Sequence, residues 1–261
     1  MARTGFMRIA AWALAFGAFA LAAAADEADI ARFKKANERL AADIEAAEKA
    51  DTQPPMLSDP ATAQEVRDAY DERFIDSLTM ESLPAANEAI AIAVKAYGKY
   101  ATFKIQNANL ASLSITDAAR MRQNYARFEG EIAMASAFFL NCGARIIEEG
   151  QKYLKNVPQD RREAGREGAL MMRQGLTKML RGAVLLQAEL TGRPGRLLVL
   201  DAVIKHLEIY AAALDPESRK AVIETIDLVL VTAKFDDDIK DKLLQIRNAM
   251  ARTDCTDFCA L

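Results

Sequence analysis

The 261-residue chain has few of the residues on which most catalytic and metal sites depend. It contains one histidine, three cysteines and one tryptophan, and aromatic residues make up only 7% of it. One histidine cannot supply the two Glu-x-x-His motifs of a di-iron bundle. The sequence also has no phosphate-binding glycine loop and no nucleophile elbow. We therefore expect no enzyme activity, no catalytic or metal-binding residue and no bound cofactor.

Glycine and proline are scarce as well, which favours helices. Only 12 glycines and 7 prolines interrupt the chain, and no stretch alternates apolar and polar residues as a half-buried strand does. Apolar residues make up 51% of the sequence, enough for a large core. The composition predicts an all-α fold.

The first 25 residues have the pattern of an export signal. Arg3 and Arg8 precede an uncharged, mostly apolar run over residues 9–25, which ends in a small-residue cleavage site. We expect cleavage after Ala25 and a periplasmic or secreted mature protein. Retention as an anchor is the alternative, although 17 residues are only marginally long enough to span a bilayer.

The mature chain is mildly acidic. Removal of the signal leaves 32 basic and 37 acidic residues, a net charge of −5. This balance does not suggest nucleic acid as a partner. We also expect no stable membrane insertion after the signal has been removed.

Residues 116–154 organise the predicted fold. Apolar residues recur there at alternating steps of four and three, close to a coiled-coil seam, at Met121, Tyr125, Phe128, Ile132, Ala135, Phe139, Cys142 and Ile146. Residues 132–144 carry no charge, and a helix that is apolar all round is usually enclosed by other helices. We predict a bundle of about eight helices in residues 58–254, built around one long central helix at 116–154.

Two other segments show the same spacing. Residues 26–51 predict an amphipathic helix with Asn37 in its apolar stripe, either a candidate arm for self-association or, as we favour, a helix packed on its own body. Residues 159–191 predict a helix that lies antiparallel to the central one. Aspartates should begin the shorter helices, at Asp59, Asp215 and Asp236.

The cysteines differ in their surroundings. Cys142 lies in the apolar stripe and should be a buried free thiol. Cys255 and Cys259 lie in a short tail, residues 255–261, and we predict a structural disulfide between them if the last helix frays there. Two thiols do not complete a zinc site.

His206 and a group of arginines are the remaining candidates. We expect His206 to be largely buried and hydrogen-bonded. The alternative is that it is an axial ligand of a haem or metal, paired with Met134 or Met172. Arg162, Arg166 and Arg173 share one helix face, which we interpret as a solvated surface with local ion pairs; a site for an anionic ligand or partner is the alternative.

These patterns predict an exported, non-enzymatic helical-bundle protein. We expect it to act as a protein-binding or scaffold module through helix–groove contacts, with another protein or a second copy of itself as its partner. The alternative is a haem- or metal-binding carrier that uses His206.

Overall fold

The computed structural model describes residues 27–105, 114–158, 166–252, 254 and 259, and these residues form helices without a strand. The predicted all-α class is confirmed. The helices are α1 (Glu27–Lys49), α2 (Ala63–Ala69), α3 (Arg73–Asp76), α4 (Leu83–Ala101), α5 (Ile115–Arg127), α6 (Glu129–Asn156), α8 (Arg166–Glu189), α9 (Arg193–Lys205), α10 (Leu207–Ala213), α11 (Pro216–Thr232) and α12 (Asp237–Met250).

The predictions for the N-terminus fall outside these residues. The expected signal, residues 1–25, and its cleavage site after Ala25 cannot be compared with the fold. Among the helices that the structure does describe, none combines the length and the apolar character needed to cross a membrane.

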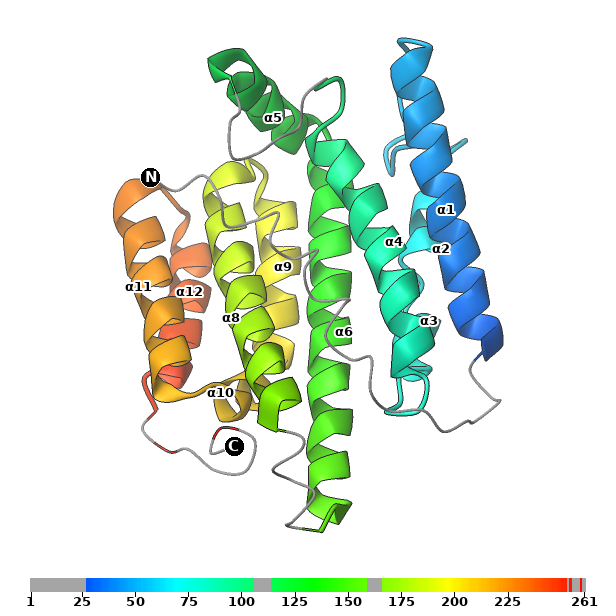
Figure 1. Cartoon of the computed structure of the whole chain (residues 1–261). Helices are drawn as coiled ribbons and strands as arrows, with labels where there is room; N and C mark the ends of the chain where they lie inside the picture. The colour runs from blue at the N-terminus through cyan, green and yellow to red at the C-terminus, as the bar shows by residue number, and fades with distance from the viewer. Residues whose placement is uncertain (1–26, 106–113, 159–165, 253, 255–258, 260–261) are drawn as a thin grey trace.

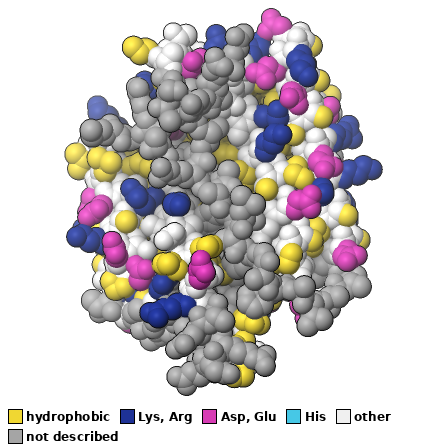
Figure 2. Space-filling model, viewed as in Figure 1, with side chains coloured by type: hydrophobic (Ala, Val, Ile, Leu, Met, Phe, Trp, Pro, Cys, Tyr) yellow, Lys and Arg dark blue, Asp and Glu magenta, His cyan; other side chains and the backbone are white. Residues whose placement is uncertain are grey.

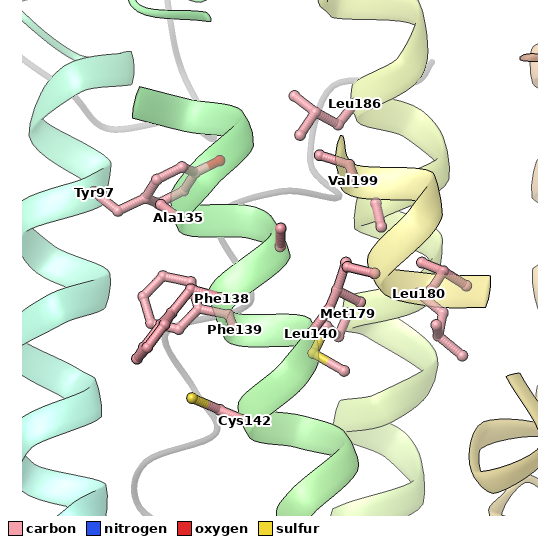
Figure 3. Packing of buried hydrophobic residues seen from close by; sticks show 14 of the residues in the cluster. Tyr97, Ala135, Phe138, Phe139, Leu140, Cys142, Met179, Leu180, Leu186 and Val199 are labelled. Atoms are coloured by element: carbon pink, nitrogen blue, oxygen red, sulfur yellow. The ribbon is translucent and has the colours of Figure 1, made fainter. Parts of the chain in front are cut away.

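The helices lie roughly side by side, with α6 between two groups (Figure 1). On one side are α1 to α4, and on the other are α8, α9, α11 and α12. Helices α6 and α8 run antiparallel, because Glu129 at the start of α6 contacts Gly192 just after α8, while Gly143 faces Met179 further along. Figure 3 shows Met179, Leu180 and Leu186 on this side of α6 and Tyr97 on the other.

The prediction of one continuous helix over 116–154 is wrong, because the chain bends at Phe128. Helix α5 ends there and α6 begins at the next residue. The Phe128 ring is fully buried against Tyr100 and Phe103, with ring centroids 5.4 and 5.5 Å away. The Asn124 amide donates to the carbonyls of Ala101 and Phe103, at 3.1 and 2.9 Å. These contacts tie α5 to the end of α4 and turn it across the top of the bundle in Figure 1.

Three further helix boundaries differ from the sequence prediction, so the described residues contain more helices than the eight expected. Asp59 does not begin a helix; its carboxylate accepts from the Ala61 amide at 3.0 Å, within a turn that precedes α2. A short break after Tyr70 separates α2 from α3, and His206 separates α9 from α10. By contrast, Asp215 begins α11 as predicted, and its side chain accepts from the Ser218 amide at 2.7 Å.

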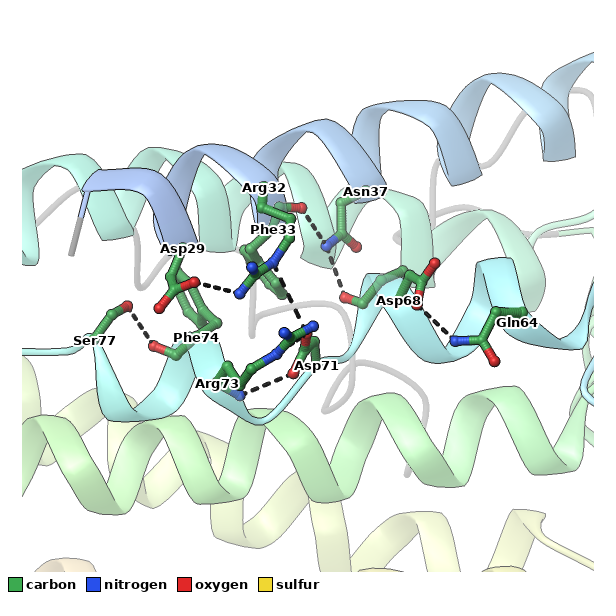
Figure 4. A network of polar contacts seen from close by, with 11 residues as sticks. Asp29, Arg32, Phe33, Asn37, Gln64, Asp68, Asp71, Arg73, Phe74 and Ser77 are labelled. Atoms are coloured by element: carbon green, nitrogen blue, oxygen red, sulfur yellow. Dashed lines mark hydrogen bonds and ion pairs between the residues drawn. The ribbon is translucent and has the colours of Figure 1, made fainter.

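Helix α1 packs on the body of the protein and does not extend as an arm. Its whole predicted stripe is buried, at Ile30, Phe33, Asn37, Leu40, Ile44 and Ala47, and it lies against α4, α2 and α3. Asn37 is fully buried, and its amide donates to the carbonyls of Phe33 and Ala69, at 3.0 and 2.8 Å (Figure 4). The polar residue in the stripe therefore joins α1 to the end of α2.

Candidate functional site: a groove along α6

One stretch of α6 is left partly uncovered and forms the floor of a groove of about 420 Å³. The floor residues are spaced i, i+3, i+4 and i+7, namely Met134, Ala137, Phe138 and Asn141. Residues with the same spacing on α9 form one wall, namely Leu198, Asp201, Ala202 and Lys205. Residues from the end of α2 to the start of α3 form the other, namely Arg67, Tyr70 and Glu72. The floor spans about 10 Å along the helix axis, which is two turns.

The floor is held rigid from below by aromatic packing. The Phe138 ring stacks on Phe33 of α1 at 5.3 Å and lies 5.7 Å from the Tyr70 ring. The Phe33 ring in turn stacks on Phe74 of α3 at 3.9 Å. Side chains from α1, α2 and α3 therefore fix the apolar surface that the groove presents.

Charged side chains line the walls above this apolar floor. Asp201 pairs with Lys242 of α12 at 2.6 Å. Arg67 and Lys205 are exposed, one on each wall, and neither forms an ion pair within the described part of the chain. Glu72, also exposed, lies on the same wall as Arg67. The groove thus offers apolar contact over Met134, Ala137 and Phe138, with one cation on either side that has no ion pair among the described residues.

His206 lies close to the Asn141 end of the groove. Its Nε2 is 3.1 Å from Asn141 Oδ1, and since that oxygen only accepts, the neutral ring carries its proton on Nε2. Burial, followed by the charge of Lys205, lowers the pKa of His206, so the ring is neutral at pH 7. Ligation of a metal through Nε2 would require the loss of this hydrogen bond.

The structure does not bring the sequence-predicted partners of His206 to its ring. Met134 lies two helix turns from Asn141, roughly 10 Å along α6, and Met172 is buried in α8. Among the described residues, no group of three or more His, Cys, Asp or Glu side chains is placed to hold a metal ion. The haem or metal alternative therefore gains no specific support from the geometry.

A buried carboxyl group lies near the groove, on α6. Glu131 is 2% exposed, and its Oε1 accepts from the Leu57 amide at 2.6 Å. Burial raises its pKa, and the same burial raises the pKa of Tyr70, whose hydroxyl has no hydrogen-bond partner. Burial therefore disfavours the ionised form of both groups, while the hydrogen bond from the Leu57 amide favours the carboxylate of Glu131.

The cysteines are only partly described. Cys142 of α6 is a free thiol buried in the core, as the apolar stripe predicts, and burial raises its pKa. Cys255 lies outside the described residues, so the predicted Cys255–Cys259 disulfide remains a prediction. Cys259 is buried and contacts Arg219.

The arginine face was predicted incorrectly at one position. Arg162 lies outside the described residues, but Arg173 is buried rather than solvated, and its Nη1 donates to the Cys259 carbonyl at 2.7 Å. Arg219, which also contacts Cys259, was missed altogether. A signal existed, because Arg219 lies three residues before Val222 on the buried stripe of α11.

The groove is the second feature that sequence reasoning missed, although its floor lies within the predicted central helix. Figure 2 shows one face of the molecule, on which the visible described basic and acidic side chains are intermixed without a broad area of one sign. The chain matches no protein-family model, and neither a curated protein nor a solved structure matches it.

Proposed function

We propose that this chain is an exported, non-enzymatic binding protein whose α6 groove receives an amphipathic helix of a protein partner. The observation that carries the proposal is the groove itself, in which the half-buried Met134 and Asn141 and the buried Ala137 and Phe138 of α6 line the floor, and α9 residues with the same spacing line one wall. The apolar part of this floor, Met134, Ala137 and Phe138, matches a partner helix with apolar residues at i and at i+3 or i+4, and Asn141 places a polar group at the i+7 end.

The charges on the walls specify the partner further. Arg67 and Lys205 stand on opposite walls without ion pairs in the described part of the chain. Acidic residues on either side of the partner's apolar stripe would pair with both of them. Such rim pairs act mainly on association rate and specificity, while the apolar contacts supply most of the affinity.

Leu198 gives a sharp test of the groove, because it is exposed and lies on the α9 wall. It is 44% exposed, and Leu244 of α12, outside the groove, is 42% exposed and serves as a matched control. Helical peptides would be selected from a display library against the protein that begins at residue 26. We expect the selected peptides to carry the apolar spacing and acidic flanks described above, with binding lost in Leu198→Asp and kept in Leu244→Asp.

Charge reversal then tests the walls. Lys205→Glu should weaken the selected peptides about tenfold at low salt and less at high salt, because rim pairs are screened. Peptides that bind Leu198→Asp as tightly as wild type would refute the groove. Visible absorbance or bound metal in protein from metal-replete cells, lost in His206→Ala, would instead favour the carrier alternative.

Export has its own test. Mass spectrometry of the protein isolated from its native compartment should show a chain that begins at Asp26. A full-length chain retained in the membrane fraction would instead show that residues 1–25 act as an anchor.

A further inference from the structure

Two arginines, one from α8 and one from α11, are buried beneath the end of the chain. Arg173 is 9% exposed and Arg219 is 1% exposed. Both reach Cys259: Arg173 Nη1 donates to its carbonyl at 2.7 Å, and Arg219 Nη2 lies 3.8 Å from its Sγ. Since one residue contacts both side chains, the two guanidinium groups converge on one place.

The hydrogen bonding of these guanidinium groups is incomplete. Arg219 donates to the backbone carbonyls of Arg252, at 3.0 Å, and Asp254. The buried Nε of each arginine has no acceptor. Among the described residues, the carboxylate oxygens that pair with these groups belong to Asp215, 3.7 Å from Arg173 Nε, and Asp254, 3.8 Å from Arg219 Nη1, both beyond hydrogen-bond length.

This arrangement is chemically mismatched. A buried guanidinium group is costly unless charged acceptors compensate it, and its planar fork of donors fits two oxygens of an oxyanion better than single neutral carbonyls. The helices that carry Arg173 and Arg219 pack directly against each other, so the relative position of the two helices does not depend on Cys259. Both are ready to accept a better-matched ligand.

We propose that Arg173 and Arg219 form a binding site for a small oxyanion, such as phosphate or a carboxylate, which the tail at Cys259 occupies in this structure. Because Arg173 Nη1 already donates to the Cys259 carbonyl, an oxyanion that takes this donor displaces that carbonyl. This site involves α8 and α11, and it is independent of the groove between α2, α6 and α9.

The test uses the protein that begins at residue 26 and titrates it with sodium phosphate, with sodium acetate as the carboxylate arm and sodium chloride at equal ionic strength as the baseline. We expect one saturable phosphate per chain by calorimetry and a Tm above the chloride baseline. Amide hydrogen exchange should become faster at Cys259 while the rest of the protein becomes more stable, which a general salt effect would not produce. If acetate reproduces these effects, the site accepts a carboxylate. If only phosphate produces them, the site is specific for a tetrahedral oxyanion.

Variants locate the site. Arg173→Gln should weaken phosphate binding about tenfold or more, because a charge-assisted fork is lost. Arg181→Gln is the matched control, since Arg181 also lies on α8 and donates to Thr225 of α11 at 2.9 Å; it should bind as wild type. If Arg219→Gln fails to fold, the phosphate affinity of Arg173→Gln and the amide hydrogen exchange at Cys259 in the wild type still test the proposal. No saturable effect of either anion on the wild type, or unchanged affinity in Arg173→Gln, would overturn the proposal.

Discussion

Glu65, at the interface of α2 with α1, is the residue with the clearest pH dependence. Burial raises its pKa to about 7, and a hydrogen bond to Asp43 adds to this, while Arg39 opposes it. One carboxylate oxygen of Glu65 is buried without a partner. The folded protein therefore holds a proton on Glu65 that the unfolded chain releases near the ordinary pKa of about 4.5.

The sign of the effect on stability follows from linkage. Because the folded pKa is the higher one, the stabilising contribution is complete below pH 4.5 and is lost as the pH rises through about 7. Glu65→Gln removes this loss. We expect the free energy of unfolding of the variant, relative to that of the wild type, to be roughly 1 kcal/mol higher at pH 8 than at pH 5, after allowance for solvent screening. Urea denaturation at both pH values measures it.

The exposed Glu224 of α11 provides the comparison for this experiment. Its carboxylate is 66% exposed and pairs with Lys220 at 3.9 Å. Glu224→Gln should show no such gain between the two pH values. An equal gain in both variants would mean that the pH dependence comes from elsewhere in the molecule.

The three cysteines should differ in reactivity. Burial raises the pKa of Cys142, so its thiol is both inaccessible and protonated in the folded state. We expect iodoacetamide to leave native protein unmodified and to label one cysteine, Cys142, after unfolding without reductant. Peptide mapping should find Cys255 and Cys259 linked. Three labelled cysteines would refute the predicted disulfide, and rapid native labelling would contradict the burial of Cys142.

At this scale, the sequence predicted residues whose surroundings come from their own helix. Cys142 could be placed because its neighbours at steps of three and four are apolar. The stripe of α11 also contains Arg219, but the contacts of Arg173 and Arg219 could not be predicted, since their partners come from the distant end of the chain. Amphipathic periodicity says which face a residue lies on, but not what later covers that face.

At the scale of helices, the bend at Phe128 shows what periodicity cannot detect. A helix that stops and restarts with little change of phase keeps the same residues on its inner side, so Tyr125, Phe128 and Ile132 are buried on both sides of the bend. The bend depends instead on long-range contacts. Glu129, the first residue of α6, is held by the loop between α8 and α9, and its carboxylate accepts from Thr191 Oγ1 at 2.9 Å and from the Gly192 amide at 2.8 Å.

Gly195 follows this loop. The effect of Gly195→Ala on stability should depend on whether Glu129 is present. A Cβ at Gly195 would lie 2.7 Å from Glu129 Oε1, although alanine normally stabilises a helix relative to glycine by about 1 kcal/mol. We therefore expect Gly195→Ala to destabilise the wild type by roughly 1 to 2 kcal/mol and to stabilise the Glu129→Ala background. Urea denaturation of the four proteins measures this reversal.

Gly168 of α8 is the control for the loop experiment. A Cβ there meets no atom within 4 Å, so Gly168→Ala should raise stability in both backgrounds, by up to about 1 kcal/mol. Glu129→Ala alone should cost roughly 2 kcal/mol, because charge-assisted hydrogen bonds to the loop are lost. The same effect of Gly195→Ala in both backgrounds would show that the close approach to Glu129 is not what constrains this position.

For the whole molecule, one continuous core joins residues from Ile30 in α1 to Met250 in α12. The all-helical class and the antiparallel pairing of α6 with α8 could be predicted, since both follow from helix stripes and a short connection. The groove could not. It exists because α2 and α3 are too short to cover the stretch of α6 between them and α9, and that is a property of how separate helices meet.

Phe33 tests whether α1 belongs to this core or acts as a separate arm. Its ring is 2% exposed and stacks on both Phe74 and Phe138, so Phe33→Ala removes a contact beneath the groove floor. We expect a loss of about 3 to 5 kcal/mol in the single cooperative unfolding transition, together with weaker binding of groove-selected peptides. Leu244→Ala, at an exposed position, should change stability by less than about 1 kcal/mol. If α1 were instead a dimerisation arm, Phe33→Ala would change the molecular mass measured by sedimentation and leave the unfolding of the remaining helices unaltered. The two outcomes differ because a helix that supports a shared core cannot be weakened without weakening every helix that packs on it.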